Sequence, residues 1–197
     1  MSDQDEILHH VEYGLKHIDG LIWLCDQLVV WERTGERPES VEIAFDGAPA
    51  AKGKVGLLQN PLAETGLIYC RKLLDFLGIK VSGKEPHCLV EVNDKGRRPD
   101  DRGVEQLGLP RLTIDELALP DEVEEACIRT IRAANKGVAH FTENRGEKLS
   151  AEQAIICAGI VVQAIEERVY DALEIERPKP IQRHESGGVP KSATVIR

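Results

Sequence analysis

The residues best suited to chemistry lie close together in one stretch near the middle of the chain. Asn135, Lys136 and His140 fall within six positions, and Arg145 follows shortly afterwards. A histidine changes its charge near neutral pH, so His140 has the chemistry of a general acid or base. Lys136 lies about one helical turn before His140 and would place a positive charge beside it. These four residues are therefore the candidate catalytic group.

The same stretch also has a purely structural interpretation. It is predicted to end a long helix, where a histidine interacts favourably with the helix dipole and caps free carbonyl groups. In that case Asn135 and Lys136 would be solvated or capping residues. The sequence leaves both interpretations open.

Two other groups of residues were considered as metal ligands. His9, His10 and His17 lie on the first predicted helix, but no two of them have the HxxxH spacing that places two ligands on one helix face. The His87-Cys88 pair has no second ligand pair at metal-binding spacing. The sequence therefore predicts neither a metal nor a cofactor.

A third segment, residues 47–55, invites comparison with a phosphate-binding P-loop. Its spacing is wrong by one position, and Val55 stands where a Ser or Thr would hold magnesium. We therefore expect a flexible loop here, although residues 41–45 alternate and are compatible with a short extended segment.

The bulk properties indicate one globular domain with an aliphatic core. The chain has 197 residues, of which 42% are hydrophobic and only 4% aromatic, and its net charge is -9. That charge disfavours a broad nucleic-acid-binding face but permits a small basic site. Five cysteines without a CxxC pair indicate reduced thiols. With no signal-like N-terminus and no long apolar run, a cytoplasmic location and no membrane contact are expected.

Apolar residues at steps of three and four predict four helices. They are expected at residues 3–33, from 57 or 61 to 77, from 121 to about 140, and 150–173. Ser2 is a suitable first cap, and capping boxes are expected where Asp121 is followed by Glu124 and Ser150 by Gln153. The fourth helix is apolar nearly all round, which suits a central position or burial in a second subunit.

The expected fold class is all-α, a four-helix up-down bundle with a polar insertion between the second and third helices. Within the insertion, residues 79–118, the segments 79–81 and 88–92 are compatible with short strands or a hairpin. The bundle domain would span residues 1–175. Prolines, glycines and isolated charges predict a disordered tail over 176–197.

Within this frame, Asn135-Lys136-x-x-Ala139-His140 resembles the motif of the HEPN superfamily. These are all-helical domains, many of them RNases of toxin–antitoxin, phage-defence and RNA-processing systems. Their motif is an Arg, usually followed by a polar residue such as Asn, and then a His. The resemblance implies metal-independent RNA cleavage, with His140 as general acid or base and an arginine on the scissile phosphate. It also implies a homodimer, because two such motifs usually meet across a dimer.

This chain departs from the motif at the arginine. Ala134 precedes Asn135, and Arg132 lies about 12 Å from His140 along a helix. The first hypothesis is therefore a non-catalytic or weakly catalytic module that binds RNA or a protein partner in a defence or toxin–antitoxin setting. The alternative is a ribonuclease that uses His140 with Lys136 or Arg145. A third hypothesis is a small-molecule or metal-binding bundle that uses the histidines of the first helix and the insertion.

Overall fold

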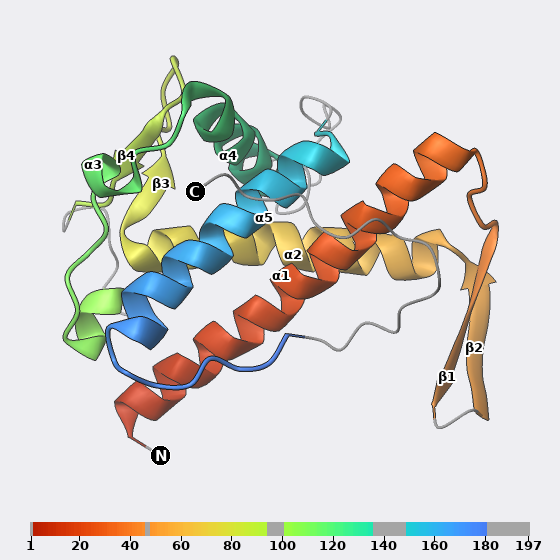
Figure 1. Cartoon of the computed structure of the whole chain (residues 1–197), viewed down its shortest axis with the longest axis horizontal. Coiled ribbons are helices and arrows are strands. Elements are labelled where there is room, and N and C mark those ends of the chain that lie inside the picture. The colour runs from red at the N-terminus through yellow and green to blue at the C-terminus, as the bar shows by residue number, and fades with distance from the viewer. Residues whose placement is uncertain (1, 46–47, 94–100, 136–148, 181–197) are drawn as a thin grey trace.

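The computed structural model describes residues 2–45, 48–93, 101–135 and 149–180 of the chain. It confirms a mainly helical fold with two small hairpins (Figure 1). The elements are α1 (Asp3–Thr34), β1 (Ser40–Phe45), β2 (Ala48–Lys54), α2 (Gly56–Leu77), β3 (Ile79–Val81), β4 (Leu89–Glu91), α3 (Ile114–Leu117), α4 (Asp121–Ala133) and α5 (Ala151–Ile165). A 3₁₀ turn (Val104–Leu107) precedes α3, and a π-helical segment (Glu166–Asp171) continues α5.

Serine side chains begin two of the long helices. The Ser2 hydroxyl accepts a hydrogen bond from the Asp5 amide at 3.1 Å, and the Asp5 carboxylate accepts one from the Ser2 amide. Ser150 and Gln153 make the corresponding pair of bonds at the start of α5. Each pair satisfies amide groups that a helix start leaves without a partner, so both predicted starts are confirmed.

The start predicted for α4 is correct in position but wrong in mechanism. Asp121 is the first helical residue, and the preceding Pro120 caps the helix without a side-chain hydrogen bond. The Glu124 carboxylate accepts instead from the backbone amide of Leu89 at 3.2 Å. A tertiary contact with β4 therefore occupies the side chain that would have completed a local capping box.

The sequence prediction was correct for one of the two hairpins and wrong for the other. Strands β3 and β4 pair antiparallel, which confirms that the insertion contains a short hairpin. The flexible loop expected over residues 47–55 is wrong, because β2 pairs with β1 from Ala48 to Lys54. The described side chains of β2 are mostly exposed alanines and lysines. Backbone pairing with β1 holds this strand in place. Because its side chains are mostly exposed, its sequence does not alternate between apolar and polar residues.

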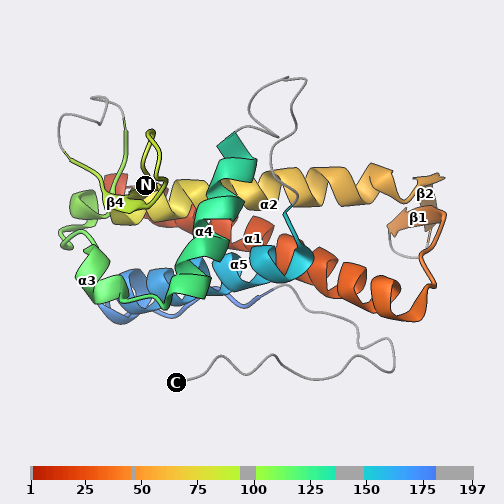
Figure 2. The same cartoon turned by 90° about the horizontal axis from the view of Figure 1, so that it is seen from above.

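The core lies where α1, α2 and α5 pack together, and α4 packs on α2 and α5. Figure 2 shows α4 running across α2 and α5. One face of α5 lies in the core, with the buried residues Ala154, Cys157, Ala158 and Ala164. Ile156 on the same helix is exposed and Ile155 is half-buried, so the apolar residues of α5 are not all covered within the described residues, and the choice between a central position and burial in a second subunit stays a prediction. The close approach of α1 and α2 depends on glycine. A Cβ atom at Gly14 would lie 2.8 Å from the Tyr69 ring, and one at Gly66 would collide with Leu21.

Of the tail expected from residue 176, only residues 176–180 are described, and Arg177 forms an ion pair with Glu166. The remaining residues, 181–197, lie outside the described part of the chain. None of the helices in the described ranges combines the length and apolar character needed to cross a membrane.

Candidate functional site

Of the four residues predicted to form the site, the structure describes Asn135. It lies two positions after the last residue of α4 and is half-buried. Lys136, His140 and Arg145 lie outside the described residues. The described part of the candidate site therefore consists of Asn135 and the groups around the end of α4.

An arginine contacts Asn135 from another helix. The Nη1 atom of Arg71, on α2, donates a hydrogen bond to the Oδ1 atom of Asn135 at 2.8 Å. Arg71 is half-buried, and the two residues are 64 positions apart in the chain. A guanidinium has five N–H donors, so one bond to an amide oxygen leaves donors for a phosphate or carboxylate. The hydrogen bond thus places a guanidinium from α2 beside the first residue of the Asn135–His140 segment.

Position 134 cannot itself supply a positive charge, because Ala134 is buried. Ala134 is fully buried, and Thr130, one turn earlier, is also fully buried and donates to the Ala126 carbonyl at 2.8 Å. An arginine at position 134 would bury a charge in an aliphatic core, which costs several kcal/mol without a partner (about 3–5 kcal/mol for an unpaired buried charge). Arg132 is half-buried and already has a partner of its own.

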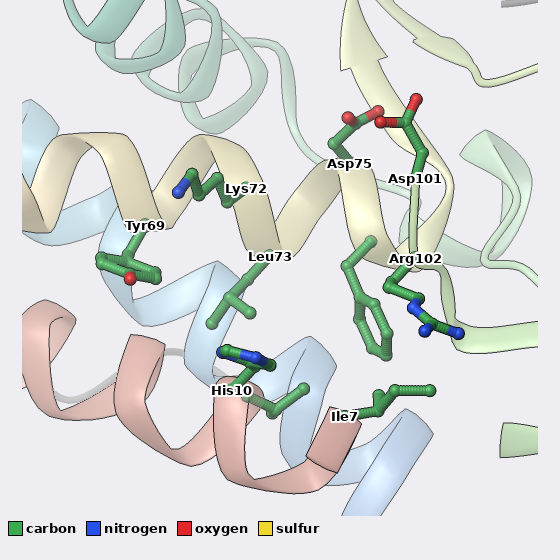
Figure 3. Close-up of a pocket in the computed structure, with 10 residues that line it drawn as sticks. Ile7, His10, Tyr69, Lys72, Leu73, Asp75, Asp101 and Arg102 are labelled. Atoms are coloured by element: carbon green, nitrogen blue, oxygen red, sulfur yellow. The ribbon is translucent and has the colours of Figure 1, made fainter. Parts of the chain in front are cut away.

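A separate pocket lies between the first half of α1, the second half of α2 and residues 101–102 (Figure 3). Its volume is about 350 Å³. Four buried apolar side chains line it: Ile7, Val11, Leu73 and Phe76. Its polar lining residues are His10, Tyr69, Lys72, Asp75, Asp101 and Arg102. A mainly apolar concavity with a few polar groups is the usual character of a small-molecule site.

Three aromatic rings form a cluster beside this pocket. The His17 and Tyr69 rings are stacked, with centroids 4.9 Å apart and an interplanar angle of 5°, and Tyr13 meets both edge-on. Burial lowers the pKa of His17 and raises the pKa of Tyr69. His17 is thus favoured in its neutral form and acts as a packing residue. Gly14 makes room for the Tyr69 ring in this cluster.

Three buried thiols meet in the core from three helices. Cys70 on α2, Cys127 on α4 and Cys157 on α5 are each fully buried. A hydrogen bond with Cys157, together with burial, raises the pKa of Cys127 far above its usual range. Burial also raises the pKa of Cys157, so Cys127 and Cys157 stay protonated and unreactive. The described residues contain no group of three or more His, Cys, Asp or Glu side chains arranged to hold a metal ion.

Sequence reasoning missed Arg71, Lys72 and Arg102. Arg71 and Lys72 are two charged residues in an ordinary amphipathic helix, and Arg102 follows a stretch of the sequence that is rich in charged residues. Their relevance comes from residues distant in the chain, so periodicity and local motifs carry no signal for it. Among the histidines considered from the sequence, His10 does line the pocket.

Comparison with known proteins found no protein-family model, no curated protein and no solved structure that matches this chain. The function of the chain therefore has to be inferred from its own residues.

Proposed function

We propose that this chain is a HEPN-like module that binds single-stranded RNA at the end of α4, with weak or no ribonuclease activity, in a defence or toxin–antitoxin setting. In this proposal α1, α2, α4 and α5 are the four helices of the bundle. The observation that carries it is the hydrogen bond between Arg71 and Asn135. It supports the proposal because it brings a guanidinium to the first residue of the Asn135–His140 motif.

The bond would allow a motif without its own arginine to bind phosphate. A guanidinium held by an amide oxygen keeps its orientation, and an oriented fork of donors recognises a phosphate better than a mobile cation does. Binding would be local, because the chain as a whole carries a net charge of -9. Lys136 and Arg145 would add positive charge to the same site.

The alternative is a metal-independent ribonuclease. In that mechanism His140 would remove the proton of a ribose 2′-hydroxyl, whose oxygen would attack the adjacent phosphorus and release the next nucleotide's 5′-oxygen. Arg71, with Lys136 or Arg145, would stabilise the charge that develops on the phosphate oxygens. A homodimer would bring two such sites together.

RNA binding is tested by fluorescence anisotropy with a labelled single-stranded RNA at several salt concentrations. We expect Arg71→Gln to weaken binding by about tenfold, as for loss of a charged hydrogen bond. The slope of log affinity against log salt should fall in magnitude by about 0.7, the value for one phosphate contact on a single strand. Arg33→Gln is the matched control, because Arg33 is exposed in the last turn of α1 and the charge change is the same. No RNA binding by the wild-type protein would refute the proposal.

Cleavage is tested with the same RNA in the presence of EDTA. Activity that disappears in His140→Ala would establish the ribonuclease alternative. Activity that persists in His140→Ala would exclude His140 as the catalytic group.

Light scattering measures the oligomeric state, and a monomer would contradict a site shared between two subunits. Capture of a protein partner without any RNA binding would assign the module to protein recognition instead.

A further inference from the structure

We propose that the pocket between α1, α2 and residues 101–102 binds a small organic anion that carries an aromatic or aliphatic body. This proposal is independent of RNA binding, because Arg71 does not line the pocket. The observations behind it are the buried apolar side chains that line the pocket, two cations without carboxylate partners among the described residues, and the direction in which the neighbouring carboxylates point.

The buried apolar side chains that line the pocket, here called its floor, determine which non-polar part of a ligand can bind. Ile7, Val11, Leu73 and Phe76 are between 2% and 8% exposed, yet all four line the pocket. Contact with such a surface favours apolar groups because it removes them from water. The volume of about 350 Å³ is at the lower end of the range for small-molecule pockets, so the body is a single ring or a short alkyl chain.

Lys72 and Arg102 determine the sign of the charge that a ligand should carry. Both are exposed and line the pocket, and neither forms an ion pair with a carboxylate within the described part of the chain. The Nζ atom of Lys72 lies 5.1 Å from the centre of the Tyr69 ring. That contact leaves the ammonium group able to bind an anion. Two such cations beside one apolar surface are notable in a chain with a net charge of -9.

The two acidic residues of the pocket point away from the head groups of Lys72 and Arg102 (Figure 3). Figure 3 shows the carboxylates of Asp75 and Asp101 pointing toward one another, while the ammonium group of Lys72 points toward Tyr69. Asp75 and Asp101 each already have an interaction partner. An anion with an apolar body could therefore contact one of the cations and the floor at the same time. A carboxylate and a phosphate monoester share this chemistry.

The test uses pairs of probes that differ in charge. Phenyl phosphate, benzoate and octanoate are the anions, and benzyl alcohol and octanol are the neutral counterparts. Binding to the full chain is measured by ligand-observed NMR and calorimetry. We expect the anions to bind at least about tenfold more tightly than the neutral probes, as for gain of a charged hydrogen bond. The comparison of phenyl phosphate with benzoate tells which anionic group the site prefers.

Two double variants locate the binding. Lys72→Gln with Arg102→Gln should weaken the anions by about tenfold or more and leave the neutral probes unchanged. Lys16→Gln with Lys84→Gln removes the same charge from exposed positions outside the pocket, and we expect it to leave anion binding unchanged. Failure of every anion to bind, equal binding of neutral probes, or equal loss in both double variants would overturn the proposal. Neither result depends on RNA binding, which the Arg71 variant tests separately.

Discussion

Arg71 on α2 and Asn135 at the end of α4 are joined by a hydrogen bond of 2.8 Å between Nη1 and Oδ1, although 64 positions separate them in the chain. The bond ties the end of α4 to the middle of α2. Both side chains are half-buried, so the bond is partly shielded from water. It is therefore expected to contribute to stability as well as to orient the guanidinium.

A double-mutant cycle with Arg71→Ala and Asn135→Ala measures this contribution. We expect a coupling free energy of about 1 kcal/mol from urea unfolding, typical of a hydrogen bond in a protein. The control is the same cycle on Glu12 and Lys16, an exposed pair one turn apart on α1 at 2.8 Å. Its coupling should be about 0.3–0.5 kcal/mol. Equal coupling free energies in the two cycles would mean that the Arg71–Asn135 bond stabilises the protein no more than an exposed ion pair does.

Gly66→Ala should destabilise the protein. A Cβ atom at this position would collide with Leu21 and lie 3.1 Å from the His17 carbonyl oxygen. Overpacking of this kind costs about 1–3 kcal/mol. Gly159→Ala is the matched control, because Gly159 lies inside α5 with nothing within 4 Å of its Cβ position. That change should stabilise by about 0.5–1 kcal/mol, and both values can be read from urea denaturation.

The five cysteines should differ sharply in reactivity toward a disulfide reagent such as DTNB. Cys88 is exposed, whereas the other four are buried, and burial raises the pKa of Cys25 to about 12. The native protein should therefore release one equivalent of the coloured product rapidly, and the denatured protein five. Cys88→Ser should remove the rapid phase. A second rapidly reacting thiol in that variant would contradict the buried thiol cluster.

Glu116 should make stability depend on pH in the acid range. Its hydrogen bond with Arg168, followed by those with Thr113, lowers the pKa of its carboxyl from 4.5 to about 2. Because the folded state favours the charged form, the contribution is present above pH 4.5 and is lost as the pH falls toward 2. Glu116→Gln should thus be less stable than the wild type at pH 7 and indistinguishable near pH 2.

Urea unfolding at a series of pH values between 7 and 2 measures this difference. Arg168→Gln should show a smaller loss at pH 7, because the Thr113 contacts of Glu116 remain. A constant gap between wild type and Glu116→Gln across the whole range would contradict the assignment.

The sequence predicted the long helices because the signals for them are local. Apolar residues recur at helical spacing, and Ser2 and Ser150 each have the partner three residues later that completes a cap. The Asp121–Glu124 pair has the same spacing, yet Glu124 binds Leu89. Local spacing therefore indicates where a helix begins, while tertiary contacts decide which group caps it.

The sequence did not predict β2 or the surroundings of the candidate sites, for different physical reasons. β2 is held by its backbone, and its exposed side chains carry no alternating pattern. Arg71 approaches Asn135, and Arg102 and His10 come to line one pocket, only after the chain has folded. Such contacts have no signature within a window of neighbouring residues.

The glycine contacts between α1 and α2 also limit how the molecule can move. Gly14, Gly20 and Gly66 each face a leucine or tyrosine side chain of the opposite helix at close range. Sliding one helix along the other would force these side chains out of their places, so shear at this interface is disfavoured. Any rearrangement on ligand binding is therefore expected to leave the α1–α2 pair fixed.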